Sequence, residues 1–201
     1  MILKRRMFVA KPNSDASKKE RSRTIRWVVT VFFVTLVVSG IISLISDEVM
    51  ARSGLLAAFA ILLGIVLLGI IFDIIGMAVA TASEKPFHSM AARKVPGAQE
   101  AIRLLRNAER VSSICNDVVG DICGVVSGSA SATIAALILT HVDLGWPRAV
   151  SLAMSALVAG LTVGGKAIGK TIAVNSCTQI VHLVGRVLHT LNRFKKKKSI
   201  R

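Results

Sequence analysis

Residues 54–82 read GLLAAFAILLGIVLLGIIFDIIGMAVATA, and this stretch decides the fold. It contains one charged residue, Asp73, and is longer than the roughly 20 residues that an α-helix needs to cross the hydrocarbon core of a bilayer. Three more apolar runs are long enough to do the same, at 27–46, about 116–140 and about 147–174. We therefore expect an all-α integral membrane protein with four transmembrane helices.

The charged residues lie between and outside these runs. The chain has 26 Lys and Arg against 11 Asp and Glu, a net charge of +15, although 53% of its 201 residues are hydrophobic. Residues 1–26 hold nine basic and two acidic side chains, residues 83–110 hold six and three, and residues 186–201 hold seven and none.

Cytoplasmic segments of membrane proteins carry an excess of Lys and Arg. The three basic segments are therefore expected inside the cell, with short loops at 47–53 and 141–146 outside. This predicts a multi-pass protein of the cell membrane with both termini in the cytoplasm. The topology accounts for the positive charge, so we expect no nucleic-acid partner.

The same distribution predicts the organisation of the chain. Residues 1–26 form a basic cytoplasmic tail, and residues 27–46 form a first transmembrane anchor, which is too long for a signal peptide and lacks a cleavage pattern after it. Residues 54–175 form a transmembrane domain that includes a cytoplasmic helical hairpin at 84–110. Residues 176–201 form a basic amphipathic juxtamembrane helix with a Lys-rich tail.

Two amphipathic segments are expected on the cytoplasmic side. The hairpin is broken at Val95-Pro96-Gly97, because Pro and Gly interrupt a helix. Near the C-terminus, apolar residues recur at spacings of four and three: Ile180, Val184, Val187, Leu191 and Phe194. That helix is expected to lie at the membrane surface or to pack on the hairpin, with the lysines at 195–198 facing anionic lipid.

Enzymatic signatures are weak. The sequence contains no G-x-S-x-G or H-E-x-x-H motif, and we expect no P-loop. Its three cysteines, Cys115, Cys123 and Cys177, form no C-x-x-C pair, which argues against a disulfide framework and against a zinc site. We therefore expect a protein that is not an enzyme.

Asp73 is the polar residue that is hardest to explain by structure alone. A carboxylate near the centre of a bilayer costs roughly 2.5–3.5 kcal/mol, so such acids are usually paired, protonated or functional. Asp73 lies about ten residues from the cytoplasmic end of its run, on the order of 15 Å deep in a helix. Its alternative interpretation is a structural contact to a neighbouring helix.

Three polar residues open the third apolar run. Asn116 and Asp117 are candidates for capping the helix, whereas Asp121 lies one turn deeper, on the same helix face as Asp117. Carboxylate and amide oxygens are the ligands that Mg²⁺ and Ca²⁺ prefer. We therefore expect Asp73, Asn116, Asp117 and Asp121 to form a metal site, with Mg²⁺ the first candidate and other divalent cations left open.

Small residues recur every four positions in the last two runs and let helix backbones approach closely. The glycines concerned are Gly120, Gly124 and Gly128 in the third run and Gly160 and Gly164 in the fourth. They predict close helix packing and a homodimer. Lys166 and Lys170 are expected to extend toward the interface, or to neutralise the acidic cluster when no metal is bound.

The order of these parts resembles the transmembrane domain of the CNNM/CorB/CorC magnesium transporters. The resemblance covers residues 72–175 and rests on Gly97-Ala98, on Leu-Leu-x-Asn-x-Glu-Arg at 104–110, and on Gly-Lys-Ala-Ile-Gly-Lys at 165–170. It implies a dimer whose polar intramembrane pocket takes a dehydrated magnesium ion, with coupled sodium movement. The family's Ser-x-x-Glu stretch reads Asp73-Ile-Ile-Gly76 here, and we expect a short form without CBS domains.

Two functions follow from these patterns. The first is a membrane protein that binds or transports divalent cations, Mg²⁺ first, through the acidic site. The second is a scaffold or accessory subunit that transports nothing, whose acids cap helices and whose basic ends bind lipid.

Overall fold

The computed structural model describes residues 14–141 and 146–198. Within these residues the chain forms helices and short connections and no β-strand, so the all-α prediction is confirmed. The first half of the predicted tail at 1–26, up to residue 13, lies outside the described residues, as do residues 142–145 of the predicted loop and residues 199–201. Residues 14–26 of the predicted tail are the beginning of the first helix.

Eight α-helices and one π-helical segment, η1, follow one another along the described chain. They are α1 (Ser14–Arg52), α2 (Leu55–Thr81), α3 (Lys85–Ala92), α4 (Ala98–Arg106), α5 (Ala108–Ser113), η1 (Ile114–Gly120), α6 (Asp121–His141), α7 (Pro147–Asn175) and α8 (Cys177–Lys198).

Four stretches of this chain are long and apolar enough to cross a membrane: Ile25–Met50, Leu55–Thr81, Ala108–Thr140 and Pro147–Asn175. The prediction of four membrane-spanning helices is confirmed at this level. The third stretch begins at Ala108 rather than near Asn116, because α5, η1 and α6 run on as one helix.

The chain forms two compact units that meet at Val37 and Val38 within α1. In the first unit, the part of α1 that ends at Val37 exposes most of its apolar side chains, including Phe32 and Phe33 at 60% and 59%. Their rings meet edge to face, with centroids 5.5 Å apart. Such exposure is what lipid contact along a membrane anchor requires.

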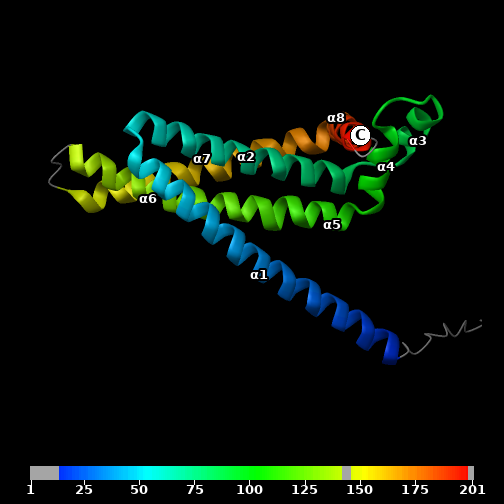
Figure 1. Cartoon of the computed structure of the whole chain (residues 1–201), viewed down its shortest axis with the longest axis horizontal. Helices are drawn as coiled ribbons and strands as arrows, with labels where there is room; N and C mark the ends of the chain where they lie inside the picture. Colours follow the sequence, from blue (N-terminus) through cyan, green and yellow to red (C-terminus); the bar gives the residue numbers. More distant parts are fainter. Residues whose placement is uncertain (1–13, 142–145, 199–201) are drawn as a thin grey trace, which may run out of the picture. The chain divides into compact units, whose positions relative to one another are not determined.

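The second unit is built around α2, α6 and α7, which lie side by side (Figure 1). One core cluster joins Leu62 and Val66 of α2 to Ile134 of α6 and Val158 of α7. The last part of α1 packs against α6, because Ser43 and Ser129 share a hydrogen bond of 2.8 Å and Thr133 donates one of 3.2 Å to Asp47.

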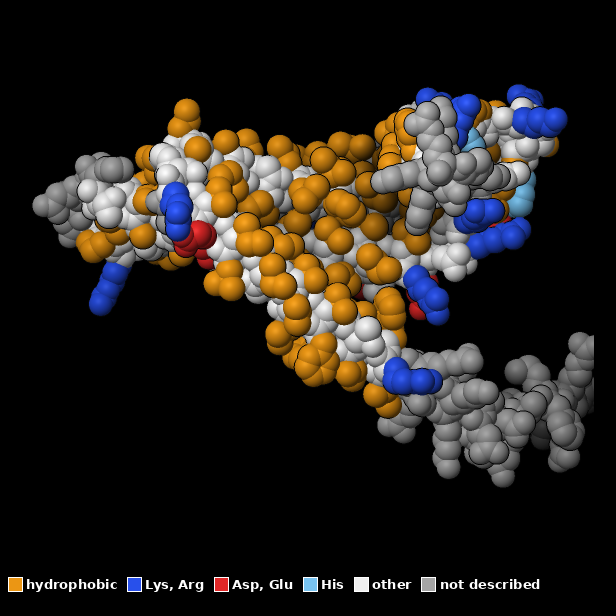
Figure 2. Space-filling model, in the orientation of Figure 1, with side chains coloured by type: hydrophobic (Ala, Val, Ile, Leu, Met, Phe, Trp, Pro, Cys, Tyr) orange, Lys and Arg blue, Asp and Glu red, His pale blue; other side chains and the backbone are white. Residues whose placement is uncertain are grey.

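Apolar side chains cover the middle of this unit on the face shown in Figure 2, and Lys and Arg lie toward its ends. At one end, α3, α4 and α8 gather beside α5 and the ends of α2 and α7 (Figure 1). A second core cluster lies there, in which the fully buried Phe87 of α3 packs with Leu105 of α4 and Val181 of α8.

Glycines let the helices approach closely at this end. Gly97 has φ +87°, a backbone conformation that L side chains rarely adopt, and ends the break that was predicted at Val95-Pro96-Gly97. A Cβ at Gly97 would lie 2.7 Å from the Cα of Arg186. Reciprocally, a Cβ at Gly185 would meet the carbonyl oxygen of Gly97 and come within 3.1 Å of the Ala101 Cβ. The start of α4 and the middle of α8 therefore touch backbone to backbone.

A glycine pair tests this contact. Gly185→Ala should lower the stability of the protein in detergent by about 1–3 kcal/mol, because backbone atoms cannot move aside as a side chain can. Gly64→Ala is the matched control, since nothing lies within 4 Å of its Cβ position. Thermal unfolding followed by circular dichroism measures both, and equal melting temperatures would contradict this packing.

Candidate functional site

Asp73 lies inside the α2 span and is only 6% exposed. Its Oδ2 is buried with no hydrogen-bond partner among the described residues. A buried polar group without a partner is costly, and an ionised carboxylate more so. This side chain is therefore the strongest indication of a functional site in the described chain.

Polar atoms from three helices converge beside Asp73, at Gly120. A Cβ at Gly120 would lie 3.9 Å from Asp73 Oδ1, 3.5 Å from Lys166 Nζ and 3.4 Å from the carbonyl oxygen of Cys115. The Cys115 carbonyl belongs to the same π-helical turn as Gly120. The groups that other helices bring to this point are therefore the Asp73 carboxylate from α2 and the Lys166 ammonium group from α7. Gly120 keeps this point free of a side chain.

Asn116 reaches α2 one turn further along, at Gly76. Its Oδ1 occupies the place where a Cβ of Gly76 would stand, and its Cγ lies 2.8 Å from that position. The Nδ2 of Asn116 donates a hydrogen bond of 3.3 Å to Ser112 Oγ, whereas Oδ1 is buried and has no partner in the described part of the chain. Asp73 and Gly76 are three residues apart and share one face of α2. The two unpartnered oxygens therefore line the same strip between α2 and η1.

Asn116 and Gly120 both belong to the π-helical segment Ile114–Gly120. A π-helix places one extra residue in a turn, is rare, and is often found at functional sites. Since α5 begins at Ala108, Asn116 and Asp117 lie within a continuous helix, and the alternative that they cap a helix is wrong.

The four residues predicted to form a metal site lie in two different environments. Asp73 and Asn116 face the interior, whereas Asp117 and Asp121 are exposed. Asp117 Oδ2 accepts a hydrogen bond of 2.7 Å from Ser113 Oγ. Over the residues that the structure describes, no three His, Cys, Asp or Glu side chains gather closely enough to hold a metal ion.

Lys166 and Lys170 also differ. Lys166 is half-buried and extends from α7 toward the Asp73 site, whereas Lys170 is exposed. No ion pair of 4 Å or less joins Lys166 to a carboxylate of the described residues. Its ammonium group therefore lies beside the carboxylate without a direct contact.

The predicted glycine ladders behave unequally. Gly120 lies at the polar point, but nothing is within 4 Å of a Cβ at Gly124, Gly128, Gly160 or Gly164. The predicted close helix packing is therefore absent at these four positions among the described residues. The contacts fall instead at Gly69, Gly76, Gly165 and Gly169, where α2 meets α6, η1 and α7. Gly165 and Gly169 belong to the predicted run of small residues in the fourth apolar stretch, whereas Gly69 and Gly76 lie outside the predicted pattern.

The expectation that the sequence holds no P-loop pattern is wrong. Residues 164–171, GGKAIGKT, match the spacing G-x-x-x-x-G-K-T of a phosphate-binding P-loop. A P-loop connects a strand to a helix and offers free backbone N–H groups. These residues lie inside α7 instead, so the match carries no phosphate site.

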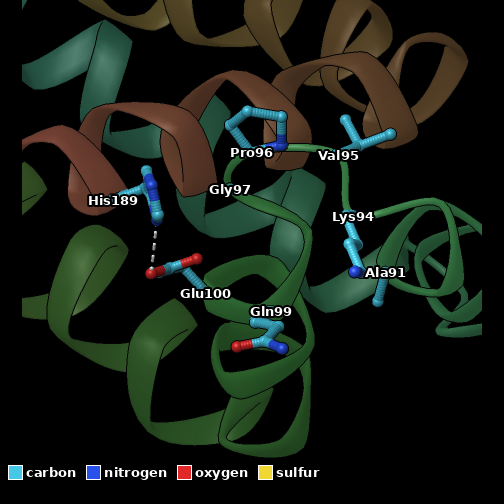
Figure 3. Close-up of a pocket in the computed structure, with 8 residues that line it drawn as sticks. All are labelled: Ala91, Lys94, Val95, Pro96, Gly97, Gln99, Glu100 and His189. Atoms are coloured by element: carbon cyan, nitrogen blue, oxygen red, sulfur yellow. Dashed lines mark hydrogen bonds and ion pairs between the residues drawn. The ribbon is translucent and has the colours of Figure 1, made fainter.

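A second polar feature lies where α4 meets α8. A cavity of about 270 Å³ is lined by Ala91, Lys94, Val95, Pro96, Gly97, Gln99, Glu100 and His189. Glu100 and His189 are joined across it by a hydrogen bond of 3.0 Å (Figure 3). Partial burial of Glu100 raises its pKa, but the bond to His189, a backbone hydrogen bond and the charges of His189 and Arg103 together hold the pKa below its usual 4.5.

Comparison with protein-family models, with curated proteins and with solved structures found no match to this chain. The fold itself defines the class as an all-helical protein with four helices that are long and apolar enough to span a membrane. Its most unusual feature is the buried carboxylate at the meeting point of α2, η1 and α7.

The Glu100 and His189 pair makes stability depend on acidity. Because the folded state lowers the pKa of Glu100, its contribution to stability is complete above about pH 4.5 and is lost as the pH falls through the folded value. Glu100→Gln should therefore be less stable than the parent protein near neutral pH, and the difference should shrink below pH 4.5. Thermal unfolding over a pH series measures this, and a difference that stays constant with pH would refute it.

Proposed function

We propose that this protein is a multi-pass membrane protein that binds divalent cations, Mg²⁺ first, at the Asp73 site and transports them. The observation that carries the proposal is the Asp73 carboxylate, 6% exposed inside an apolar span, with Oδ2 buried and unpartnered among the described residues. Ionisable residues at such depth usually mark ion pathways.

The oxygen atoms around Asp73 suit a hard cation. Asp73 supplies a carboxylate, Asn116 an amide oxygen without a donor, and Cys115 a backbone carbonyl. Mg²⁺ and Ca²⁺ prefer such oxygen ligands, and Mg²⁺ commonly uses few carboxylates together with water. A bound cation would satisfy both unpartnered oxygens, which no hydrogen-bond donor of the described chain does.

The ammonium group of Lys166 places a positive charge of the protein itself at the site. Its Nζ lies within 4 Å of the point that Asp73 Oδ1 also approaches. Without a metal, the ammonium group balances the charge of Asp73. A divalent cation that occupies this point has to displace the ammonium group, because two positive charges at that distance repel. Lys166 therefore competes with the transported ion.

Orientation and assembly complete the proposal. The excess of basic residues at 1–26, 83–110 and 186–201 supports cytoplasmic termini and a cytoplasmic hairpin. The open positions at Gly124, Gly128, Gly160 and Gly164 are consistent with a homodimer in which another copy packs on them. The resemblance of residues 72–175 to CNNM/CorB/CorC transporters supports the dimer.

A second candidate function is a membrane scaffold or accessory subunit that transports nothing. It is favoured by Lys166, since a lysine beside a buried aspartate is also a purely structural way to balance charge. The exposure of Asp117 and Asp121 favours it too, because it leaves only one carboxylate at the interior site.

An aspartate pair tests cation binding. Magnesium should raise the melting temperature of the parent protein, by roughly 5–10 °C at a concentration a hundred times the Kd, because a ligand of the folded state stabilises it. Asp73→Asn should abolish this shift and cation flux in liposomes. Asp121→Asn is the matched control and should retain both, since this carboxylate is exposed. A parent protein without a magnesium-dependent shift, or an unchanged shift in Asp73→Asn, would rule the site out.

A lysine pair separates the two functions. If Lys166 competes with the ion, Lys166→Gln should bind magnesium several-fold more tightly while being less stable without it. Lys170→Gln should leave both properties unchanged, because Lys170 is exposed. Isothermal titration and thermal unfolding measure these quantities. Equal destabilisation of Lys166→Gln with and without magnesium would favour the scaffold.

A further inference from the structure

Helix α8 lies across the bundle rather than along it. Figure 1 shows it nearly end on, while α2, α6 and α7 run lengthwise. A single residue, Ser176, separates it from the membrane-spanning α7. A helix that begins directly at the end of a span and runs across it lies in the plane of the membrane surface.

One side of α8 is occupied by the protein itself. Val181 is fully buried in the cluster with Phe87 and Leu105, and Gly185 touches the backbone at Gly97. The hydrogen bond from His189 to Glu100 continues this contact along α4. The predicted packing of the C-terminal helix on the preceding basic segment therefore involves only part of its apolar surface.

The rest of that apolar surface is open. Leu183, Val187, Leu191 and Phe194 recur at spacings of four, four and three, which aligns them on one face of a helix. Their exposed fractions are 60%, 52%, 58% and 68%. We call these four residues the open stripe. A continuous stripe of large apolar side chains is costly in water and indicates a surface that binds something apolar.

Basic residues lie on another side of α8. Arg186 and Arg193 are both exposed, and each is about 100° around the helix from its neighbour in the open stripe, Val187 or Phe194. The sequence adds Lys195–Lys198 at the end of the helix, and α8 contains no acidic residue. An apolar stripe beside a purely basic flank complements the border between acyl chains and anionic headgroups.

We propose that α8 is an interfacial helix that embeds the open stripe among the acyl chains of the adjacent leaflet and holds anionic lipid headgroups with Arg186 and Arg193. The packing on α4 fixes the rotation of α8, so the stripe is presented to the bilayer in one orientation. This role does not depend on cation binding at Asp73.

The test measures the depth of two adjacent positions. In a full-length chain with Trp27 and Trp146 replaced by Phe, a single tryptophan is introduced by Phe194→Trp on the open stripe, or by Arg193→Trp as the matched control. The proteins are reconstituted in phosphatidylcholine vesicles with and without phosphatidylglycerol, using lipids brominated on the acyl chain. Phe194→Trp should be quenched by the bromines several-fold more than Arg193→Trp, and acrylamide in the water should show the reverse order.

Anionic lipid supplies the second readout. Phosphatidylglycerol should increase the quenching of the Phe194→Trp fluorescence by the brominated acyl chains. Adding Arg186→Gln to that variant should make this increase smaller. Equal quenching of both tryptophans by the bromines, or strong quenching of Phe194→Trp by acrylamide, would overturn the proposal. It would also be overturned if Phe194→Trp were shielded from both quenchers until the protein is diluted in lipid, since a second copy would then cover the stripe.

Discussion

The hydrocarbon core of a bilayer offers no hydrogen-bond partners, so each polar group inside it must find one within the protein. Helices meet this requirement for the backbone, and the spans of this chain are helical for that reason. The Asp73 carboxylate, unlike the helical backbone, lacks a hydrogen-bond donor for its Oδ2 among the described residues. Packing between α2, η1 and α7 removes it from lipid, yet leaves one of its oxygens without a donor in the described chain. The nearby ammonium group of Lys166 and the space kept by Gly76 and Gly120 are arranged around this single charge.

The sequence predicted the helical class and the four spans, because the length of an apolar run and the absence of charge within it are local properties that need no knowledge of packing. It placed the start of the third span too late. Polar residues usually end an apolar run, so Asn116 and Asp117 predict a boundary, whereas the helix begins at Ala108 and carries both of them. Polar side chains are tolerated there since Asn116 faces protein and Asp117 is bonded to Ser113.

The candidate site was predictable only in part. Asp73 and Lys166 were visible in the sequence because each is a charge in an otherwise apolar stretch. The separation of Asn116 from Asp117 and Asp121 was not, since it depends on which side of this helix faces α2, and only the packing decides that. Glycine patterns misled for a related reason. The spacing of glycines shows which side of a helix carries small residues. It does not show whether another helix of the same chain packs on that side, as one does at Gly76 but not at Gly160.

The π-helical turn fixes more than the residues inside it. Ile114–Gly120 is π-helical, so its backbone hydrogen bonds run to the fifth residue along instead of the fourth, and a π-bulge holds about one extra residue in its turn. Each residue of an α-helix turns the chain by about 100°. The extra residue therefore rotates the side chains of the following helix, from Asp121 to His141, by about that angle around the helix axis. A chain one residue shorter here would still have an apolar run long enough to span a membrane, yet would present a different side of α6 to α2 along its whole length.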